Sequence, residues 1–262
     1  NVLWPSAGAL VIIRTLVFLK GFAMADYVIE QAPVAVLPVV GSESVFPVRR
    51  IYCVGRNYAA HAREMGGDPT REAPFFFCKP ADAVVPVRTG TLGELAYPSA
   101  TQDFHHEVEL VVAIGRGGAD IPVAQALDHV WGYTVGLDMT RRDLQGALKS
   151  KGQPWEAAKA FDHSAPVAPL VPVERCGHPD AAPIWLTVNG EARQHGDLAD
   201  MIWSVAEIVA RLSAYFRLEP GDLIFTGTPE GVGPVKPGDV VEAAVDGLAS
   251  LALRIVQAGE EA

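Results

Sequence analysis

The sequence consists largely of short apolar runs separated by glycine and proline, and this spacing limits the fold more than any other feature. Runs of this length, often rich in β-branched and aromatic residues, are typical of β-strands. The 25 glycines and 20 prolines make up roughly 17% of the chain, against roughly 12% in average composition. We therefore predict strands over 51–54, 75–78, 108–114, 132–137, 184–188, 223–226, 240–245 and 249–256.

Turn and helix signals favour a β-dominated α+β fold with few short helices. Asn-Gly at 189–190 and Asp-Gly at 246–247 predict tight hairpin turns. Helices are predicted over 124–130, 140–148 and 205–216, the second with Thr140 as its N-cap. The third begins with a capping box of Ser204 and Glu207 and ends before a Pro-Gly pair.

The first 50 residues lack this regular pattern. Residues 7–23 are apolar and end at an Ala-Met-Ala sequence that resembles a signal-peptide cleavage site, but Arg14 and Lys20 interrupt the run and no basic residue precedes it. A secretory signal is one interpretation; we instead predict that Met24 is the natural start and that 1–23 are non-native or upstream residues. An extended lead-in over 24–50 and a single domain over 51–257 follow. No later run is long enough to predict a membrane span.

Composition argues against several classes of protein. The 49% of hydrophobic residues is too high for a disordered chain, and a net charge of -10 provides no basic excess for nucleic acid. The three cysteines, Cys53, Cys78 and Cys176, form no CxxC pair, which argues against a disulfide scaffold or a zinc site. We expect a reducing, cytoplasmic setting in which the cysteines act as small buried apolar residues.

Two glutamates at the start of the most apolar predicted strand give the sharpest functional signal. Glu107 and Glu109 are two residues apart, so their side chains share one face of the strand. A solvated strand face is the ordinary interpretation. The uninterrupted run over 110–114 instead indicates a strand covered on both sides, where two carboxylates are costly to bury unless a cation joins them. Oxygen ligands favour Mg²⁺, Mn²⁺ or Ca²⁺ over zinc.

Asp138 offers a third oxygen donor. It follows the predicted strand over 132–137, and its alternative role is a carboxylate stabilised by the start of the next helix. Arg142 and Gln145 lie three residues apart on one face of that helix and add a cation and an amide nearby.

His61 and Glu64 have the i, i+3 spacing of a single helical turn. The carboxylate can hold one imidazole nitrogen and leave the other to take a proton from water. A solvated helical turn is the alternative. The segment 66–69 contains two glycines and a proline, which predicts a mobile connection and places the pair on a closing lid.

Two further segments have a functional and an ordinary interpretation. Lys159 lies among Ala, Trp and Phe residues, so it either extends across apolar surface or pairs with an oxyanion or carboxylate. The segment TGTPEGVG (226–233) is either a plain turn or a loop whose backbone N–H groups bind an anion. It matches no nucleotide-binding glycine pattern, and no G-x-S-x-G supports a serine hydrolase.

Taken in order, these segments resemble the fumarylacetoacetate hydrolase family, most closely its short acylpyruvate-cleaving members. The resemblance covers roughly 200 residues of the chain. It is carried by YCVGRNYAAHAREMG (52–66), FFFCKPADAVV (75–85), HHEVELVVAIG (105–115), GLDMTRRDLQ (136–145), KGQPWEAAKAFD (151–162), VNGEARQHGD (188–197) and GDLIFTGTPEGVGPVKPGD (221–239).

The resemblance implies a mixed β-sandwich roll, a homodimer and a divalent cation, Mg²⁺ or Mn²⁺, with Ca²⁺ able to bind in vitro. It implies that water is activated by His61 and Glu64 and that Lys159 is the active-site lysine. It further implies metal ligation by Glu107, Glu109 and Asp138, and substrate contacts from Arg142, Gln145, Thr228 and Lys79.

The implied activity is hydrolysis of the C–C bond of a 3-acylpyruvate, a small anionic keto acid. Fumarylpyruvate, cleaved to fumarate and pyruvate in gentisate-type aromatic catabolism, is the expected substrate. The alternatives are a general acylpyruvase, an oxaloacetate decarboxylase, and an isomerase or decarboxylase of aromatic-degradation intermediates. A non-catalytic metal-dependent binding protein is the alternative from another class.

Overall fold

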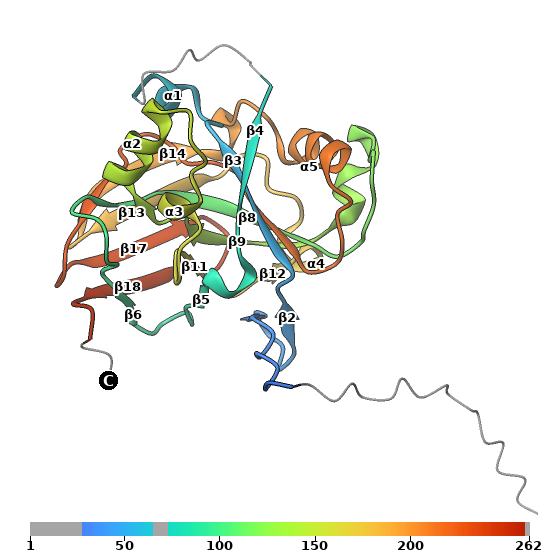
Figure 1. Cartoon of the computed structure of the whole chain (residues 1–262). Helices are drawn as coiled ribbons and strands as arrows, with labels where there is room; N and C mark the ends of the chain where they lie inside the picture. The colour runs from blue at the N-terminus through green and yellow to red at the C-terminus, as the bar shows by residue number, and fades with distance from the viewer. Residues whose placement is uncertain (1–27, 65–72, 260–262) are drawn as a thin grey trace, which may run out of the picture. The chain divides into compact units, whose positions relative to one another are not determined.

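The computed structural model describes residues 28–64 and 73–259 (Figure 1). The described residues from Val34 onward belong to one compact unit. Its strands are β1 (Val36–Pro38), β2 (Val45–Pro47), β3 (Arg50–Gly55), β4 (Phe75–Lys79), β5 (Val84–Pro86), β6 (Gly93–Ala96), β7 (Phe104–His106), β8 (Val108–Ile114), β9 (Val130–Leu137), β10 (Thr140–Arg141), β11 (Ala165–Val167), β12 (Val171–Pro172), β13 (Pro183–Val188), β14 (Glu191–Asp197), β15 (Asp222–Phe225), β16 (Gly233–Val235), β17 (Val240–Val245) and β18 (Leu251–Val256). Its helices are α1 (Ala59–Glu64), α2 (Arg142–Ser150), α3 (Glu156–Lys159), α4 (Val173–Cys176) and α5 (Val205–Tyr215), with 3₁₀ helices η1 (Ala81–Ala83), η2 (Val123–His129) and η3 (Leu198–Asp200).

A large mixed sheet forms the centre of this unit. Its strand order is β4-β3-β15-β8-β9-β11-β5, with β12 paired to β9. The pairs are antiparallel except for β3 with β15 and β5 with β11. Every residue of β8 is buried, as the unbroken apolar run predicts for a strand covered on both faces. The carboxylates at its start therefore lie inside the protein.

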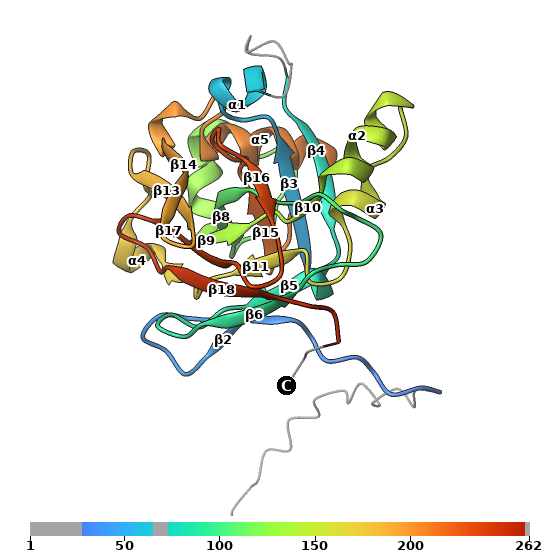
Figure 2. The same cartoon turned by 90° about the vertical axis from the view of Figure 1, so that its left-hand side faces the viewer.

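A second sheet, in the order β14-β13-β17-β18-β6, packs against one face of the large sheet. Figure 2 shows β17, β18 and β6 following one another on the side that faces the viewer. The side chains between the two sheets and α5 form the main core, which includes Leu110 and Val112 from β8, Leu186 from β13 and Ile208 from α5. The sandwich of curled sheets confirms the predicted β-dominated fold.

The opposite face of the large sheet is covered partly by the hairpin of β1 and β2. Leu37, Phe46 and Val48 pack there against Val111 and Phe225. The predicted lead-in over 24–50 thus contains a paired hairpin whose side chains belong to a hydrophobic core. Predictions for residues 1–23 and for the connection over 66–69 fall outside the described residues.

Most local predictions agree with the structure. Each predicted strand is present within two residues of its expected bounds, and the hairpin turns connect β13 to β14 and β17 to β18. The capping box at Ser204 and Glu207 is formed as predicted. Among residues 28–64 and 73–259, no helix has the length and apolar character to cross a bilayer.

Three local expectations were wrong. Thr140 is not a helix N-cap. It belongs to β10, where it pairs with His105 of β7, and its hydroxyl donates to the carbonyl of Asp138. The segment predicted as a helix over 124–130 forms a 3₁₀ helix, confined between Pro122 and the start of β9. Cys53 is buried as expected, but Cys78 is exposed on β4, at the edge of the large sheet.

Asn57 joins the end of β3 to two distant segments and so positions α1. Its buried side-chain amide donates to the carbonyls of Trp203 (3.0 Å) and Thr226 (2.8 Å), and its Oδ1 accepts from the N–H of Trp203 (2.7 Å). Gly227 passes close by at φ 96°, where a Cβ atom would lie 2.7 Å from that of Asn57. The residues ahead of α1 are therefore fixed to the segment that follows β15.

We predict that Asn57→Ala destabilises the protein by about 3 kcal/mol, because it leaves buried polar groups at Trp203 and Thr226 without partners. Urea unfolding measures the effect. The control is Gln125→Ala, at an exposed position, which is expected to change the unfolding free energy by less than about 0.5 kcal/mol. Equal unfolding midpoints for the two variants would contradict this role of Asn57.

Candidate functional site

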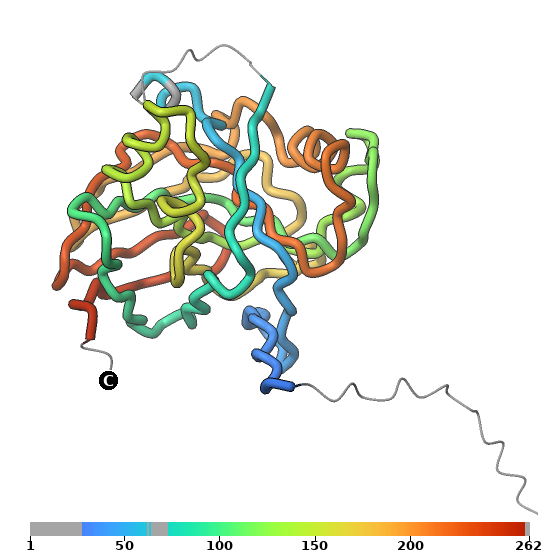
Figure 3. The backbone as a smooth tube through the Cα atoms, in the orientation of Figure 1, coloured from blue at the N-terminus to red at the C-terminus, as the bar shows by residue number. Residues whose placement is uncertain are grey.

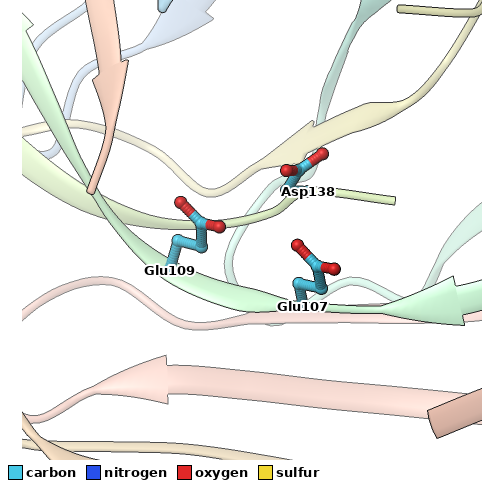
Figure 4. A group of neighbouring side chains, drawn as sticks. All are labelled: Glu107, Glu109 and Asp138. Atoms are coloured by element: carbon cyan, nitrogen blue, oxygen red, sulfur yellow. The ribbon is translucent and has the colours of Figure 1, made fainter. Parts of the chain in front are cut away.

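Three carboxylates converge where β8 begins and β9 ends (Figure 4). Val108 of β8 pairs with Leu137 of β9, and the N–H of Asp138 donates to the carbonyl of Glu107 at 2.9 Å. This antiparallel register sets Asp138 directly across from Glu107, while Glu109 lies two residues further along the same face of β8. A ligand oxygen from each of the three lies within 4.8 Å of the others. The structure thus brings together the predicted metal ligands.

All three carboxylates are buried, with Glu109 and Asp138 only 1% exposed. Burial raises the pKa of Glu109 well above its usual value, and the neighbouring Asp138 and Glu107 raise it further. Burial acts in the same direction on Glu107, but the Lys159 ammonium and the Arg142 guanidinium outweigh it and lower its pKa. Without a metal, Glu109 therefore holds a proton more readily than Glu107.

Lys159 and Lys79 supply buried positive charge next to the carboxylates. The Lys159 Nζ lies 2.7 Å from Glu107 Oε2 and 2.8 Å from Asp138 Oδ2. Burial by itself would lower the pKa of Lys159, but Asp138 and Glu107 raise it. The Lys79 Nζ lies 2.8 Å from Asp138 Oδ1 and donates to the carbonyl of Met139. The functional interpretation of Lys159 is favoured, because its ammonium pairs with two carboxylates and does not reach solvent.

Helix α2 brings Arg142 and Gln145 to the same place. Arg142 pairs with Glu107 through Nη2 and donates through Nη1 to Gln145 Oε1 at 2.5 Å. When all three carboxylates are ionised, they are matched in formal charge by three cations, Lys79, Lys159 and Arg142, which pair with Glu107 and Asp138. A divalent cation would add two positive charges to a neutral cluster, and the all-oxygen donor set suits Mg²⁺ or Mn²⁺. The residues present therefore fit such a metal, and with it the site would attract an anion.

His61 lies on α1 with its side chain 6% exposed. It lines the same pocket. Like Lys159 and Arg142, whose effects are larger, it lowers the pKa of Glu107 against the effect of burial. The helical turn predicted from the i, i+3 spacing is present as α1. The side chain of Glu64 is outside the described part of the structure, so its predicted contact with His61 remains a prediction.

The segment after β15 contacts the site by a hydrogen bond to the carboxylate of Glu109. The N–H of Gly227 donates to Glu109 Oε2 at 2.7 Å, so this backbone group holds a metal-ligand candidate in place. Thr228 follows; it is buried and lines the pocket. One N–H group of the TGTP segment thus binds a carboxylate of the protein itself, and binding of a ligand anion by this segment stays a prediction.

Gln194 is a site residue that the sequence did not reveal. Its Nε2 donates to Thr228 Oγ1 (2.8 Å) and to the carbonyl of Pro229 (2.9 Å), and its Oε1 accepts from the N–H of Val108 (3.0 Å). Because Thr228 Oγ1 accepts this bond, its own proton remains available to donate into the pocket. Gln194 is the buried residue of β14, but the largely polar sequence EARQHGD over 191–197 gave no signal that its side chain points inward.

Most of these groups line one pocket. The predicted site residues that line it are His61, Glu107, Glu109, Asp138, Arg142, Gln145, Lys159 and Thr228. Lys79 lies behind them, against Asp138, and does not line the pocket. Sequence reasoning missed the remaining lining residues, Val54, Gly55, Arg56, Phe75, Phe77, Lys149 and Trp155.

Comparison with known proteins shows which family and which solved structures this chain is similar to. The family described as fumarylacetoacetate (FAA) hydrolase C-terminal matches residues 50–256. The crystal structure of fumarylpyruvate hydrolase from Pseudomonas aeruginosa, in complex with Mn²⁺ and pyruvate, is 60% identical, with a TM-score of 0.88 over 88% of this chain and 100% of that one.

Two curated relatives are named for reactions of oxaloacetate. The mitochondrial oxaloacetate tautomerase FAHD1 of Mus musculus is 46% identical over 79% of this chain and 91% of its own length. The mitochondrial oxaloacetate decarboxylase of Dictyostelium discoideum is 42% identical over 76% of this chain and 90% of its own length. The relatives thus share the fold and differ in the reaction they are named for.

We predict that Glu109→Gln stabilises the metal-free protein, and more so at about pH 8 than at about pH 5. The pKa of Glu109 is raised in the folded protein, whereas in the unfolded chain it is about 4.3. Above that pH the unfolded chain binds fewer protons than the folded protein, so the free energy of unfolding of wild type falls as the pH rises. Glutamine does not titrate and escapes this loss. Thermal unfolding in the presence of a chelator measures the difference.

The exposed Glu94 provides the matched control as Glu94→Gln. The same pair of variants tests metal binding, because Mn²⁺ stabilises a protein that binds it. Mn²⁺ should raise the Tm of wild type and of Glu94→Gln, but not of Glu109→Gln. A Tm of Glu109→Gln that falls below that of metal-free wild type at both pH values would contradict the electrostatic argument.

Proposed function

The chain belongs to the fumarylacetoacetate hydrolase family, and we propose that it is a divalent-metal-dependent hydrolase that cleaves the C–C bond of a 3-acylpyruvate. Fumarylpyruvate is the proposed substrate, with fumarate and pyruvate as products. The observation that carries the proposal is the presence, in one pocket, of a buried carboxylate triad, a buried lysine and a buried histidine. The 60% identity to the fumarylpyruvate hydrolase of Pseudomonas aeruginosa supports the choice of substrate.

Glu107, Glu109 and Asp138 would hold the cation, Mg²⁺ or Mn²⁺. When bound, it supplies Lewis-acid stabilisation of the negative charge that develops on the keto-acid oxygens. With the cation, the pocket carries an excess of positive charge, which suits the carboxylate and keto group of an acylpyruvate. Arg142 and the free proton of Thr228 provide donors for that carboxylate. Lys79 would act by holding Asp138 in position.

His61 is the proposed base. It takes a proton from water, which then forms a C–O bond at the distal carbonyl, and Glu64 would orient the imidazole. Lys159 and Gln145 donate to the oxyanion formed there, each donor worth about 3 kcal/mol in such sites. When the C–C bond breaks, its electron pair passes to the pyruvate part as an enolate, and protonation of that carbon completes the reaction. Together, these proposed roles assign steps of the reaction to residues of one site.

Activity on oxaloacetate is the second candidate, and it rests on the two curated relatives. Tautomerisation or decarboxylation of oxaloacetate uses the same metal and enolate chemistry but adds no water to the substrate. A buried base beside the acidic cluster favours hydrolysis over decarboxylation, which has no water to activate. It does not separate hydrolysis from tautomerisation, because a base also removes the C–H proton of oxaloacetate when the enol forms. The homodimer and the cytoplasmic location are proposals that rest on the family resemblance and on the cysteine content.

We predict that His61→Gln lowers hydrolysis of fumarylpyruvate by about 100-fold or more, since removing a general base typically costs that much. Decarboxylation of oxaloacetate should fall far less. The assay follows pyruvate release by the Mn²⁺-loaded full chain with each substrate, and enol absorbance reports tautomerisation. His195→Gln, at an exposed position, is the control and should match wild type.

Each alternative gives a different result in this assay. Loss of both activities to the same extent in His61→Gln would show that the histidine does not act on water. Turnover of oxaloacetate without hydrolysis of any acylpyruvate would favour the second candidate. Metal binding without turnover of either substrate would favour a non-catalytic binding protein.

A further inference from the structure

The pocket has an outer part that the proposed mechanism leaves unused. Its walls contain two cationic residues, Arg56 and Lys149, and three aromatic residues, Phe75, Phe77 and Trp155. The carboxylate triad, Lys159 and Thr228 are buried, whereas Phe75 is 39% exposed and Lys149 is also exposed. This gradient in exposure defines a floor, where the keto acid would bind, and a rim that opens to solvent.

An aromatic belt connects the floor to the rim. The Lys159 Nζ lies 5.3 Å from the centroid of the Phe77 ring, which is 6.0 Å from the ring of Trp155. Trp155 meets Phe75 edge to face at 5.5 Å, and the Arg56 guanidinium carbon lies 5.8 Å from the Phe75 centroid. The belt thus runs from the proposed oxyanion donor to a guanidinium at the rim. Its flat, apolar walls suit a planar, unsaturated chain.

The backbone holds Arg56 at the rim. Arg56 has φ 61°, a left-handed conformation that is uncommon for a residue with a side chain. Both of its neighbours in the chain are held in place. Gly55, the last residue of β3, packs against Phe75, and the side chain of the buried Asn57 forms three hydrogen bonds. A strained conformation persists only where the surroundings impose it, and here its result is a guanidinium beside Phe75.

Lys149 reaches the rim from α2. Arg142, Gln145 and Lys149 are spaced i, i+3 and i+7, so they follow one face of the helix. Arg142 pairs with Glu107 at the floor, Gln145 is buried next to it, and Lys149 is exposed further along. Helix α2 lies against α3, which carries Lys159 (Figure 3). Lys149 therefore adds a second cation above the floor.

We propose that Arg56 and Lys149 bind a second carboxylate at the far end of the acyl group. The pocket then selects acylpyruvates with an extended, planar acyl chain that ends in a carboxylate: the keto acid occupies the floor, the chain lies along Phe77, Trp155 and Phe75, and the distal carboxylate pairs with the two cations. This inference rests on the proposed function and specifies the substrate class of the same site. An acyl group without a terminal carboxylate lacks the outer contact.

The first test compares fumarylpyruvate with acetylpyruvate, which has no distal carboxylate. In Arg56→Gln the ratio of kcat/KM for fumarylpyruvate over acetylpyruvate is expected to fall about tenfold, mainly through the KM for fumarylpyruvate, because a charge-assisted hydrogen bond is lost. In Lys149→Gln the ratio should fall about threefold, since the lysine is exposed. Arg63→Gln, an exposed arginine of α1 that does not line the pocket, is the control.

An unchanged ratio in both variants would overturn the inference while leaving the hydrolase intact. Absence of pyruvate release from either substrate in wild type would instead count against the proposed function. A second measurement then decides the inference without turnover: calorimetric titration of the Mn²⁺-loaded protein with fumarate and with crotonate, which lacks one carboxylate. Wild type should bind fumarate about tenfold more tightly, and Arg56→Gln should lose that preference; equal binding of the two acids by wild type would overturn the proposal.

Discussion

Repulsion among three buried carboxylates is the constraint on which the rest of the site depends. Glu107, Glu109 and Asp138 lie too close together and too deep in the protein to be ionised without compensation. Lys159, Lys79 and Arg142 supply that compensation for Glu107 and Asp138 in fixed positions, whereas burial and the neighbouring carboxylates raise the pKa of Glu109. With all three carboxylates ionised, a divalent cation would give this cluster two net positive charges, so the same arrangement would also create affinity for the proposed anionic substrate. The net charge of -10 over the whole chain therefore says little about the partner, since the local charge decides binding.

Holding these charges in place requires segments that lie far apart in the chain. Gln194 connects the backbone of β8 to Thr228, and Asn57 connects the start of α1 to the end of β15. Gly227 contacts both Asn57 and Glu109. Neither amide side chain lines the pocket, yet together they set the distance between the proposed base, the candidate metal ligands and Thr228. Fully satisfied buried networks of this kind define a single geometry because each alternative leaves a polar group unpaired.

The pocket combines rigid and permissive regions. Its floor is built from buried strands and charge pairs, which would fix the position of the proposed keto acid, whereas its rim is formed by a strand edge, a loop and an exposed helix face. Relatives that share the fold and are named for oxaloacetate reactions are consistent with a floor that performs enolate chemistry in general. Differences in substrate would then arise at the rim, where side chains change without disturbing the core.

Several features follow from the sequence alone because they depend on a single element. The period of two in β8 places Glu107 and Glu109 on one face, the apolar run after them requires burial on both sides, and Ser204 with Glu207 marks the start of α5. The tertiary structure decided what these faces meet. Only the register between β8 and β9 sets Asp138 across from Glu107, and only the packing of α3 brings the Lys159 ammonium between them. Periodicity records which way a side chain points from its own element, whereas the partners it finds depend on strand pairing and helix packing between residues distant in the chain, and Gln194 and Arg56 escaped notice for that reason.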